Sequence, residues 1–358
     1  MKKAMIAMSG GVDSSVAAYM MQQAGYACMG VTLKLYQSDV DYSCNEKTCC
    51  SLKDVEDARA VAAAMNMPYY VLNFSEYFDD AVIKRFVDTY MAGGTPNPCI
   101  DCNRYIKFEK LLDRMYELGY DYVVTGHYAR IEMDEKTGRY LLKKGLDEGK
   151  DQSYVLYNLT QEQLSHTKFP LGEYTKNEIR EIAQAQGFVN AKKRDSQDIC
   201  FVPDGDYASF IERYTGKTFP EGNFVLQDGT VMGTHKGMIR YTIGQRKGLG
   251  LSLPAPLYVC GKNMETNEVI LSDNQSLFTT TFEAEDMNWI SVPGIDGPIR
   301  CKAKIRYKQQ EADATVRPIA DGRVEVTFDA PQRGITSGQA VVLYDGDTVI
   351  GGGTIITG

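Results

Sequence analysis

The clearest chemical signal is a glycine-rich turn near the amino terminus, Ser9-Gly10-Gly11-Val12-Asp13-Ser14-Ser15. Two glycines after an apolar run let the backbone turn tightly and come close to a ligand. Asp13 to Ser15 can start a helix whose free N–H groups and partial positive charge face the turn. Serine hydroxyls add donors, and Asp13 can hold a magnesium ion against phosphates. These residues favour an anion site, although an ordinary capped strand-to-helix turn uses similar ones.

The turn differs from two common phosphate loops. It lacks the Gly-Lys-Ser/Thr ending of a Walker loop and the three-glycine dinucleotide fingerprint. It resembles the Ser-Gly-Gly-x-Asp-Ser loop of enzymes that split ATP into AMP and pyrophosphate to adenylate a substrate. That resemblance implies the nucleotide half of a reaction and leaves the substrate open.

Two cysteine-containing segments, far apart in the chain, offer sulfur chemistry. Residues 94–103 form a loop by their prolines, and Cys102 within them precedes a helical stretch with two lysines. Cys200 follows the basic cluster 192–194, which is equally consistent with a solvated surface run. A thiol near a helix start and cations tends to ionise. A single cysteine is more often a small buried apolar residue, so it is the pair that favours reactivity.

Composition restricts the class of protein. The chain has 358 residues, 43% hydrophobic and 24% charged, which suits two or three folded domains and excludes disorder. A net charge of −8 argues against indiscriminate coating of nucleic acid. The apolar run at 4–8 is too short for a signal peptide, and no stretch approaches the roughly 18 residues of a membrane helix. We therefore expect a cytoplasmic protein that uses its nine cysteines as thiols or ligands.

The elements that must position these groups alternate along the first 130 residues. Alternation of strands and helices implies an α/β fold, a parallel sheet with helices on both faces. The expected strands are 4–8, 27–35, 69–72 and 122–125, and the expected helices are 13–23, 52–65, 79–90 and 108–118.

The residue pattern changes from about Gly205, where glycine and proline separate short runs rich in Val, Ile, Thr and Tyr. Few helical periods remain, and runs such as 257–261, 269–271 and 324–328 indicate strands. We predict two small β-rich units divided near 272–279. The expected domains are 1–204, 205–273 and 274–358.

Basic residues occupy alternate positions in one segment of the last unit. Lys302, Lys304, Arg306 and Lys308 would share one face if the segment is a single strand. Such a face suits phosphate contacts, and an ordinary exposed strand is the alternative.

Taken together, these segments closely resemble the bacterial tRNA-specific 2-thiouridylase family, which exchanges the 2-oxygen of the wobble uridine for sulfur. The resemblance spans nearly the whole chain and includes residues 125–129, 150–154, 171–173, 241–250 and 331–339. It implies an amino-terminal PP-loop ATP pyrophosphatase domain of the adenine-nucleotide hydrolase type. A small β-rich domain and a carboxy-terminal β-barrel would follow.

The resemblance also implies roles for matching residues. ATP, with Mg²⁺ on Asp13, would contact Ala7, Met8, Ser9, Gly10, Gly11, Val12, Asp13, Ser14, Leu33 and Gly126. Cys200 would carry a sulfane sulfur as a persulfide, and Cys102 would assist its release or delivery. The positions matching tRNA contacts are Asn97, Pro98, Cys99, His127, Lys150, Asp151, Gln152, Arg306, Tyr307 and Gln339. Without the resemblance, His127 is as well interpreted as a structural histidine at a strand end.

The implied partners are the tRNAs for lysine, glutamate and glutamine, and a cysteine desulfurase that acts directly or through a sulfur carrier. We expect a monomer that binds one tRNA. Two rival functions use the same loop: another adenylating synthetase, and a non-catalytic tRNA- or nucleotide-binding module. The first would not need a cysteine pair, and the second would not need Asp13 or Cys200.

Cys99 departs from the family's commonest pattern, in which aspartate occupies this position. The acid-base role usually assigned there is therefore open, and Cys99 becomes a third catalytic candidate. Cys99, Cys102 and Cys200 could instead hold three irons of a [4Fe-4S] cluster whose fourth iron carries sulfide.

The remaining cysteines are less informative. Cys44, Cys49 and Cys50 would bind zinc only with a fourth ligand that the sequence does not identify, and incidental thiols in a loop are the alternative. Cys28, Cys260 and Cys301 lie in strand-like runs and are expected in cores.

Overall fold

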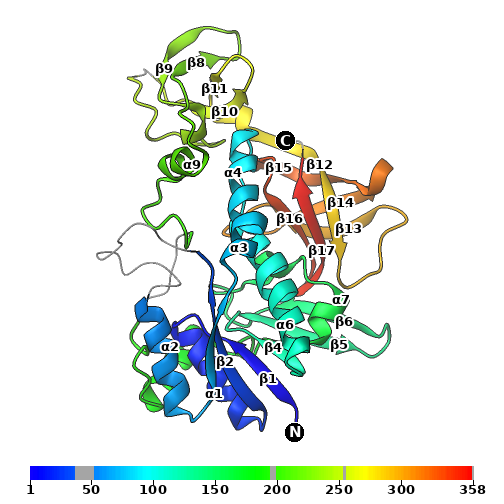
Figure 1. The fold of residues 1–358 in the computed structure, drawn as a ribbon. Helices are drawn as coiled ribbons and strands as arrows, with labels where there is room; N and C mark the ends of the chain where they lie inside the picture. The colour runs from blue at the N-terminus through cyan, green and yellow to red at the C-terminus, as the bar shows by residue number, and fades with distance from the viewer. Residues whose placement is uncertain (37–51, 194–198, 253–254, 357–358) are drawn as a thin grey trace.

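The computed structural model describes residues 1–36, 52–193, 199–252 and 255–356. In Figure 1 the amino-terminal part, coloured blue to green, combines a sheet with helices. A small sheet lies at the top of the view, and a β-barrel coloured yellow to red lies beside the cyan helices. Across these described residues, no helix is both long and apolar enough to span a membrane.

The amino-terminal sheet is wholly parallel, as predicted. Its strands, in spatial order, are β3 (Tyr69–Asn73), β2 (Ala27–Lys34), β1 (Lys3–Ala7), β4 (Tyr122–Val124) and β7 (Thr167–Lys168). Each of the four predicted strands is present within one or two residues. Parallel strands end at a common edge, so the segments after β1, β2 and β4 meet there.

Apolar side chains cover both faces of this sheet. Along β1, Ala4 and Ile6 pack in one buried cluster and Met5 in another, as the alternation of a strand requires. The first cluster includes residues of α1 (Val12–Gln23), α2 (Leu52–Ala64) and α8 (Lys176–Ala185). The second includes residues of α3 (Ser75–Phe78), η1 (Asp79–Ile83), α4 (Lys84–Met91), α5 (Pro98–Asp101), η2 (Cys102–Lys110) and α6 (Leu111–Glu117).

The central part is a four-stranded sheet of order β10-β11-β8-β9. Its strands are β8 (Gly222–Leu226), β9 (Val231–His235), β10 (Tyr258–Asn263) and β11 (Glu268–Ser272). It has its own buried cluster, in which Phe224 packs with Val259 and Val269. The preceding helix α9 (Tyr207–Thr215) was not predicted, although Asp206 caps its start by accepting from the Ser209 N–H at 3.0 Å.

The last part is a closed six-stranded barrel, which confirms the predicted class. Its strands, in spatial order, are β12 (Phe278–Trp289), β15 (Val324–Arg333), β14 (Ala312–Pro318), β13 (Ile299–Lys304), β16 (Ala340–Asp345) and β17 (Thr348–Ile355). Pairing of β12 with β17 closes it. A hairpin from the amino-terminal part, β5 (Ala129–Asp134) and β6 (Arg139–Lys144), joins β17 where Thr348 pairs with Lys143.

Short helices complete the structure. They are η3 (Ser153–Leu156), α7 (Gln161–Ser165), η4 (Met238–Arg240), η5 (Gln275–Leu277) and η6 (Ala320–Gly322).

Candidate functional site

The glycine-rich turn lies between β1 and α1, at the carboxyl edge of the parallel sheet. Gly10 has φ of +73°, and a Cβ there would lie 2.3 Å from the Asp54 carbonyl oxygen, so only glycine fits. The Ser14 hydroxyl donates to the Gly11 carbonyl at 3.1 Å and accepts from the Ser9 N–H at 3.2 Å. These bonds fix the turn around the amino end of α1.

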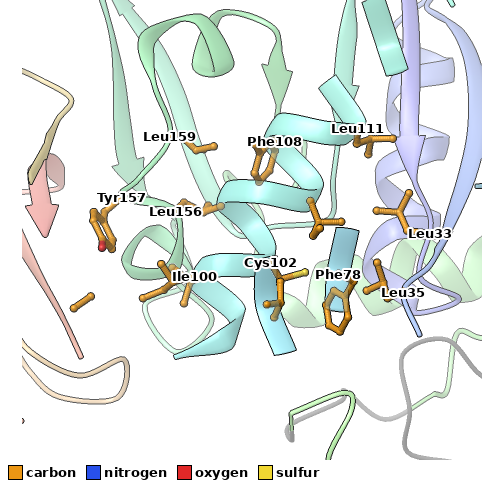
Figure 2. Close-up of a cluster of buried hydrophobic side chains, with 14 of the residues drawn as sticks. Leu33, Leu35, Phe78, Ile100, Cys102, Phe108, Leu111, Leu156, Tyr157 and Leu159 are labelled. Atoms are coloured by element: carbon orange, nitrogen blue, oxygen red, sulfur yellow. The ribbon is translucent and has the colours of Figure 1, made fainter. Parts of the chain in front are cut away.

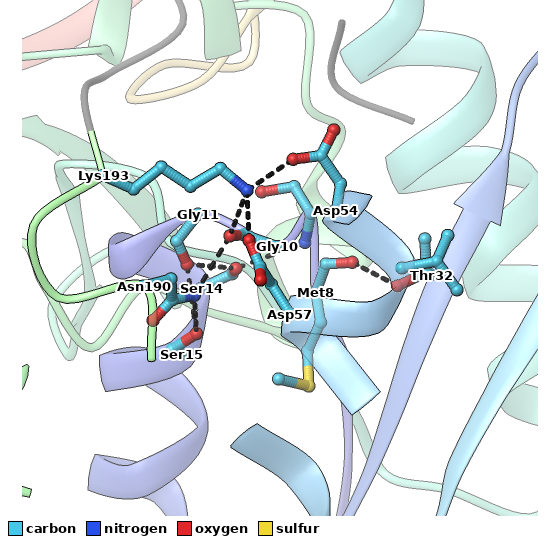
Figure 3. A network of polar contacts seen from close by, with 12 residues as sticks. Met8, Gly10, Gly11, Ser14, Ser15, Thr32, Asp54, Asp57, Asn190 and Lys193 are labelled. Carbon is cyan, nitrogen blue, oxygen red and sulfur yellow. Dashed lines mark hydrogen bonds and ion pairs between the residues drawn. The ribbon is translucent and has the colours of Figure 1, made fainter. Parts of the chain in front are cut away.

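Two residues from a distant segment, Asn190 and Lys193, form hydrogen bonds to the glycine-rich turn (Figure 3). The Asn190 amide donates to the Gly10 carbonyl at 3.0 Å and to the Ser15 hydroxyl at 2.9 Å. The Lys193 Nζ donates to the same carbonyl at 3.1 Å and to the carboxylates of Asp54 and Asp57, at 2.6 Å each. Lys193 is therefore engaged at the turn and is not part of a solvated surface run.

Asp13 sits in the first turn of α1 and is held by two side chains that the sequence reasoning missed. The Lys176 Nζ lies 2.7 and 2.8 Å from its two carboxylate oxygens. The Tyr128 hydroxyl donates to one of them at 2.8 Å. The capping box of Thr175 and Glu178 makes Lys176 the first residue of α8, but it does not indicate the contact with Asp13.

The structure brings the predicted ATP-contacting residues to one edge. Residues 7–14 follow β1, Leu33 lies near the end of the neighbouring strand β2, and Gly126 follows β4 on the other side. A Cβ on Gly126 would lie 2.8 Å from the Ser14 nitrogen. Glycine at this position therefore lets the end of β4 approach the start of α1.

The loop of Cys99 and Cys102 places its two thiols differently. The Asn97 side chain caps α5 by accepting from the Cys99 N–H at 3.2 Å, with Pro98 at the first helical position. Cys99 is exposed, whereas Cys102 starts η2 and lies in the buried cluster beside Phe78 (Figure 2).

Cys200 reaches the same buried cluster from the other end of the domain. It is partly buried and packs against that cluster, and its carbonyl accepts from the Tyr36 hydroxyl at 3.0 Å. The neighbouring Phe201 ring lies edge-on, 5.7 Å between centroids, to the Phe78 ring beside Cys102. Cys102 and Cys200 therefore border one apolar cluster, although 98 residues separate them.

Cys28 and Cys301, expected in cores, pack at the edges of hydrophobic clusters, whereas Cys260 belongs to none of the described clusters. Cys28, Cys260 and Cys301 lie in β2, β10 and β13 and are partly buried. Burial raises the pKa of the Cys28 thiol to about 11 and that of Cys301 to about 12, which disfavours their thiolates. Cys44, Cys49 and Cys50 lie outside the described residues. Within the described ranges, no group of three or more His, Cys, Asp and Glu side chains is placed to hold a metal ion.

Three residues of the predicted tRNA set make internal contacts. His127 is 7% exposed, packs between Phe108 and Phe169, and its Nδ1 lies 2.7 Å from the Thr125 hydroxyl. Asp151 is also buried, and its carboxylate accepts from the N–H groups of residues 145 and 153. The Gln152 side chain accepts from the Tyr128 N–H at 3.0 Å. Their tRNA roles stay predictions.

The burial of His127 has an effect on stability that depends on pH. Burial, with a smaller contribution from Lys107, holds the pKa of His127 well below its ordinary 6.5. As the pH falls below about 6.5, the unfolded chain binds a proton that the native state does not, so the free energy of unfolding decreases. His127→Gln should remove this loss, by up to about 1.4 kcal/mol per pH unit.

Urea unfolding of both proteins from pH 8 to pH 5 measures this effect. At pH 8 the difference between them reflects packing alone, because the histidine is neutral in both states. As the pH falls, we expect the free energy of unfolding to decrease more for the wild type than for His127→Gln. If the free energies of unfolding of the two proteins changed in parallel with pH, His127 would take up its proton in the folded protein as it does in the unfolded chain.

The loop before α5 is attached to the barrel. The Gln339 side chain donates to the Thr95 carbonyl at 2.7 Å, and the Thr95 N–H donates to the Ser337 carbonyl at 3.1 Å. Arg104 of η2 forms an ion pair with Asp286 of β12. Predicted tRNA contacts from both parts, Asn97 and Gln339, are thereby held near each other.

A cavity of about 100 Å³ lies at this junction, between the Cys99 loop and the barrel. Asn97, Asp101, Arg104 and Asp286 are among its lining residues. Burial raises the pKa of Asp101 to about 6, against the opposing effects of Arg85 and Arg104. A carboxyl group that titrates near neutrality therefore lies next to Cys102 in sequence.

The prediction that a basic face continues along one strand from Lys302 to Lys308 is wrong beyond Lys304. Strand β13 ends there, and Arg306 and Lys308 lie in a bend and a turn. The Arg306 guanidinium turns to the Gly334 carbonyl and the Thr336 hydroxyl, which removes it from the alternation. Burial raises the pKa of Tyr307 to about 12, with smaller contributions from Asp151 and Cys99.

Comparison with known proteins matches the whole chain. Three family models match in order: a tRNA methyl transferase HUP domain over residues 2–204, a tRNA methyl transferase PRC-barrel domain over 208–273, and an aminomethyltransferase beta-barrel domain over 279–355. A curated relative from Clostridioides difficile, the tRNA-specific 2-thiouridylase MnmA, is 52% identical over 99% of this chain and 98% of its own length. The protein of that name from Acetivibrio thermocellus is 50% identical over 99% of both chains. The chain therefore belongs to the tRNA-specific 2-thiouridylase family.

Proposed function

We propose that this protein is an ATP-dependent tRNA-uridine 2-sulfurtransferase that acts on the wobble uridine of tRNA. One observation carries the proposal: a nucleotide turn and two distant cysteines, Cys102 and Cys200, belong to one folded unit. The segment that holds Gly10, residues 190–193, comes shortly before Cys200 in the sequence. Relatives named 2-thiouridylase, similar over the full chain, support the same reaction.

The first half-reaction would occur at the turn. Uridine O2 attacks the α-phosphorus of ATP, the bond to the bridging oxygen breaks, and pyrophosphate leaves with the electron pair. The oxygen at C2 thereby becomes part of an AMP leaving group. Backbone N–H groups at the start of α1 would donate to phosphate oxygens, and the Ser14 hydroxyl would do so only by giving up its bond to the Gly11 carbonyl.

The second half-reaction would occur at the cysteines. In the persulfide scheme, the Cys102 thiolate attacks the inner sulfur of a Cys200 persulfide, forms a Cys102–Cys200 disulfide and releases hydrosulfide. Hydrosulfide attacks C2 of the adenylated uridine and AMP departs with the oxygen. An external dithiol would then reduce the disulfide. The shared apolar cluster supports the scheme, because the segments that carry the two thiols both pack in or against it.

Magnesium would supply charge neutralisation to the phosphates when bound, and Asp13 is the carboxylate available at the turn. Both of its oxygens already accept from Lys176. An ion coordinated by Asp13 would therefore share the carboxylate with Lys176 or replace it.

A [4Fe-4S] cluster on Cys99, Cys102 and Cys200 is the second candidate for the sulfur source. The three thiols differ in environment, with Cys99 exposed and Cys102 inside the buried cluster. As described, they do not form a ready metal site.

Purification under nitrogen, followed by iron and sulfide analysis, separates the two schemes. We expect less than one iron per chain with thiolation intact in the same sample. Close to four irons and four sulfides per chain, lost together with thiolation after oxidation, would overturn the persulfide scheme.

The activity itself is tested by incubating the protein with ATP, a sulfur donor and an unmodified tRNA that has a wobble uridine. Digestion should yield 2-thiouridine. Pyrophosphate release without a thiolated nucleoside would favour another adenylating synthetase, and no turnover would favour a binding module.

We propose tRNAs for lysine, glutamate and glutamine as substrates and a cysteine desulfurase or a sulfur carrier as the donor. We also propose that the protein is a cytoplasmic monomer with domains 1–204, 205–273 and 274–358.

A further inference from the structure

Lys304, the last residue of β13, is a partly buried cation beside two aromatic rings. Its Nζ lies 5.8 Å from the centre of the Tyr154 ring and 5.9 Å from the centre of the Tyr307 ring. The Tyr154 ring is fully buried, and its hydroxyl donates to the Ala340 carbonyl at 2.8 Å. The Tyr307 ring lies beside it, with 6.1 Å between the two centroids. Cation–π attraction to both rings holds the ammonium in place.

This ammonium has no close anion in the part of the chain that the structure describes. No hydrogen bond or ion pair joins its Nζ to another described group. Asp151 and Glu311 attract it without contact, but Asp151 accepts from two backbone N–H groups and Glu311 pairs with a lysine of β6 at 2.7 Å. Burial lowers the pKa of Lys304 against the attraction of these carboxylates, with a smaller contribution from the same lysine. A partly buried ammonium with three N–H donors therefore favours an anion that a ligand brings.

The surroundings of Lys304 connect it to the loop where sulfur transfer is proposed. Tyr154 belongs to η3, and the Asn103 amide of η2 donates to the Val155 carbonyl of η3 at 2.9 Å. Helix η2 begins with Cys102. Because the proposed sulfur transfer requires the target uridine near Cys102, the tRNA backbone beside that uridine must pass close to this junction of η3 and the barrel.

A phosphate of the tRNA backbone is the anion that suits this position. Phosphate oxygens receive a large share of the hydrogen bonds that proteins make to nucleic acids, and lysine is one of their main donors. Phosphates of ATP are the other source. They are proposed to lie at the glycine-rich turn, whose described contacts come from Asn190 and Lys193, and none of the printed bonds of that turn in the described chain involves β13.

We propose that Lys304 binds a backbone phosphate of the tRNA next to the target uridine, and that the rings of Tyr154 and Tyr307 position its Nζ for this contact. This inference rests on the proposed function and deepens it, because it assigns a residue that fixes the tRNA at the site. Lys304 is a positioning residue. It stays protonated, donates to a phosphate oxygen and takes no part in adenylation or sulfur transfer.

The first test measures the affinity for an unmodified tRNA with a wobble uridine over a series of salt concentrations. Lys304→Met should bind about 10- to 100-fold more weakly at low salt, the loss expected for one charge-assisted hydrogen bond. The slope of log affinity against log salt should fall by about 0.7, the value for one phosphate of a single strand. Lys304→Arg keeps the charge and should keep the slope.

Lys302→Met is the matched control, because Lys302 lies on the same strand and is exposed. Both lysines point away from the barrel core, which contains Ala303 and Ile305. Salt screens an exposed charge, so this variant should lose much less affinity than Lys304→Met. Equal losses in the two variants would show a general effect of net charge and would overturn the proposal.

The second test removes the charge from the tRNA. A neutral methylphosphonate replaces, in turn, each of the two phosphates that flank the wobble uridine. One of these tRNAs should bind wild type about 10-fold more weakly, whereas Lys304→Met should lose nothing further, because its contact is already absent. If neither replacement weakened wild type, or if both proteins lost affinity equally, the proposal would be wrong. The wild-type comparison needs no variant, so it decides even if Lys304→Met fails to fold.

A third measurement separates the two sources of phosphate. Lys304→Met should bind a non-hydrolysable ATP analogue as wild type does. Weaker binding of the analogue by a variant that melts cooperatively would assign Lys304 to the nucleotide and overturn the tRNA contact. A wild-type protein that binds no tRNA would instead contradict the proposed function.

Discussion

Replacing Cys200 by serine is expected to stop the formation of 2-thiouridine while ATP cleavage continues. A serine hydroxyl cannot form a persulfide, and removal of a covalent nucleophile commonly costs at least about 1,000-fold in rate. Serine is close to cysteine in size, so packing against the cluster that contains Phe78 should change little. The nucleotide turn makes its described contacts through Asn190 and Lys193, which this substitution leaves in place.

The measurement follows two products in the same reaction. Pyrophosphate release with tRNA should stay within a few-fold of wild type, and 2-thiouridine in the nuclease digest should fall below detection. Cys260→Ser is the matched control, because that thiol lies in β10 and donates to the Ile270 carbonyl at 3.4 Å. Normal thiolation by Cys200→Ser would show that the sulfur is carried elsewhere.

Elements with a strong local pattern could be predicted from the sequence. The strand at Lys3–Ala7 and the helix at Val12–Gln23 follow from an apolar run, a glycine turn and a helical period, all within about 20 residues. The parallel sheet followed from alternation. The helix of Cys102 starts earlier than its period indicates, because Asn97 and Pro98 cap the short α5 that leads into it.

Features that depend on distant pairing could not be predicted in this way. The β5–β6 hairpin extends the edge of β17 with one described residue pair in register, Lys143 with Thr348, which no local pattern indicates. The basic alternation from Lys302 fails because β13 ends at Lys304, and an arginine contact with a neighbouring loop bends the chain. Strand length depends on such tertiary contacts, so alternation alone overestimates it.

The candidate site shows the same division. Its loops were found from residue types, but the side chains that hold Asp13 were not. Lys176 lies in an ordinary capped helix start, and only the packing of α8 on α1 brings its ammonium to the turn. A buried ion pair between residues 163 positions apart has no signature in one sequence.

Replacing Asp13 by alanine is expected to abolish adenylation. Pyrophosphate release with tRNA should fall at least about 100-fold, the usual cost of losing one electrostatic contact in an active site. The variant also leaves the Lys176 ammonium buried without its described carboxylate. Asp80→Ala is the control, because Asp80 forms only an exposed pair with Lys84 among its described ion pairs.

Asp13 contacts Lys176 and is proposed to hold Mg²⁺, and a double-mutant cycle separates the effects of the two. If Asp13 acts only by positioning Lys176, then Asp13→Ala combined with Lys176→Met should be no slower than Lys176→Met alone, because the two losses are not additive. If Asp13 also holds Mg²⁺, the double variant should be slower than Lys176→Met, and raising the Mg²⁺ concentration should partly restore Lys176→Met but neither protein without Asp13. Adenylation at the wild-type rate in Asp13→Ala would exclude both roles and would assign the turn a function other than ATP cleavage.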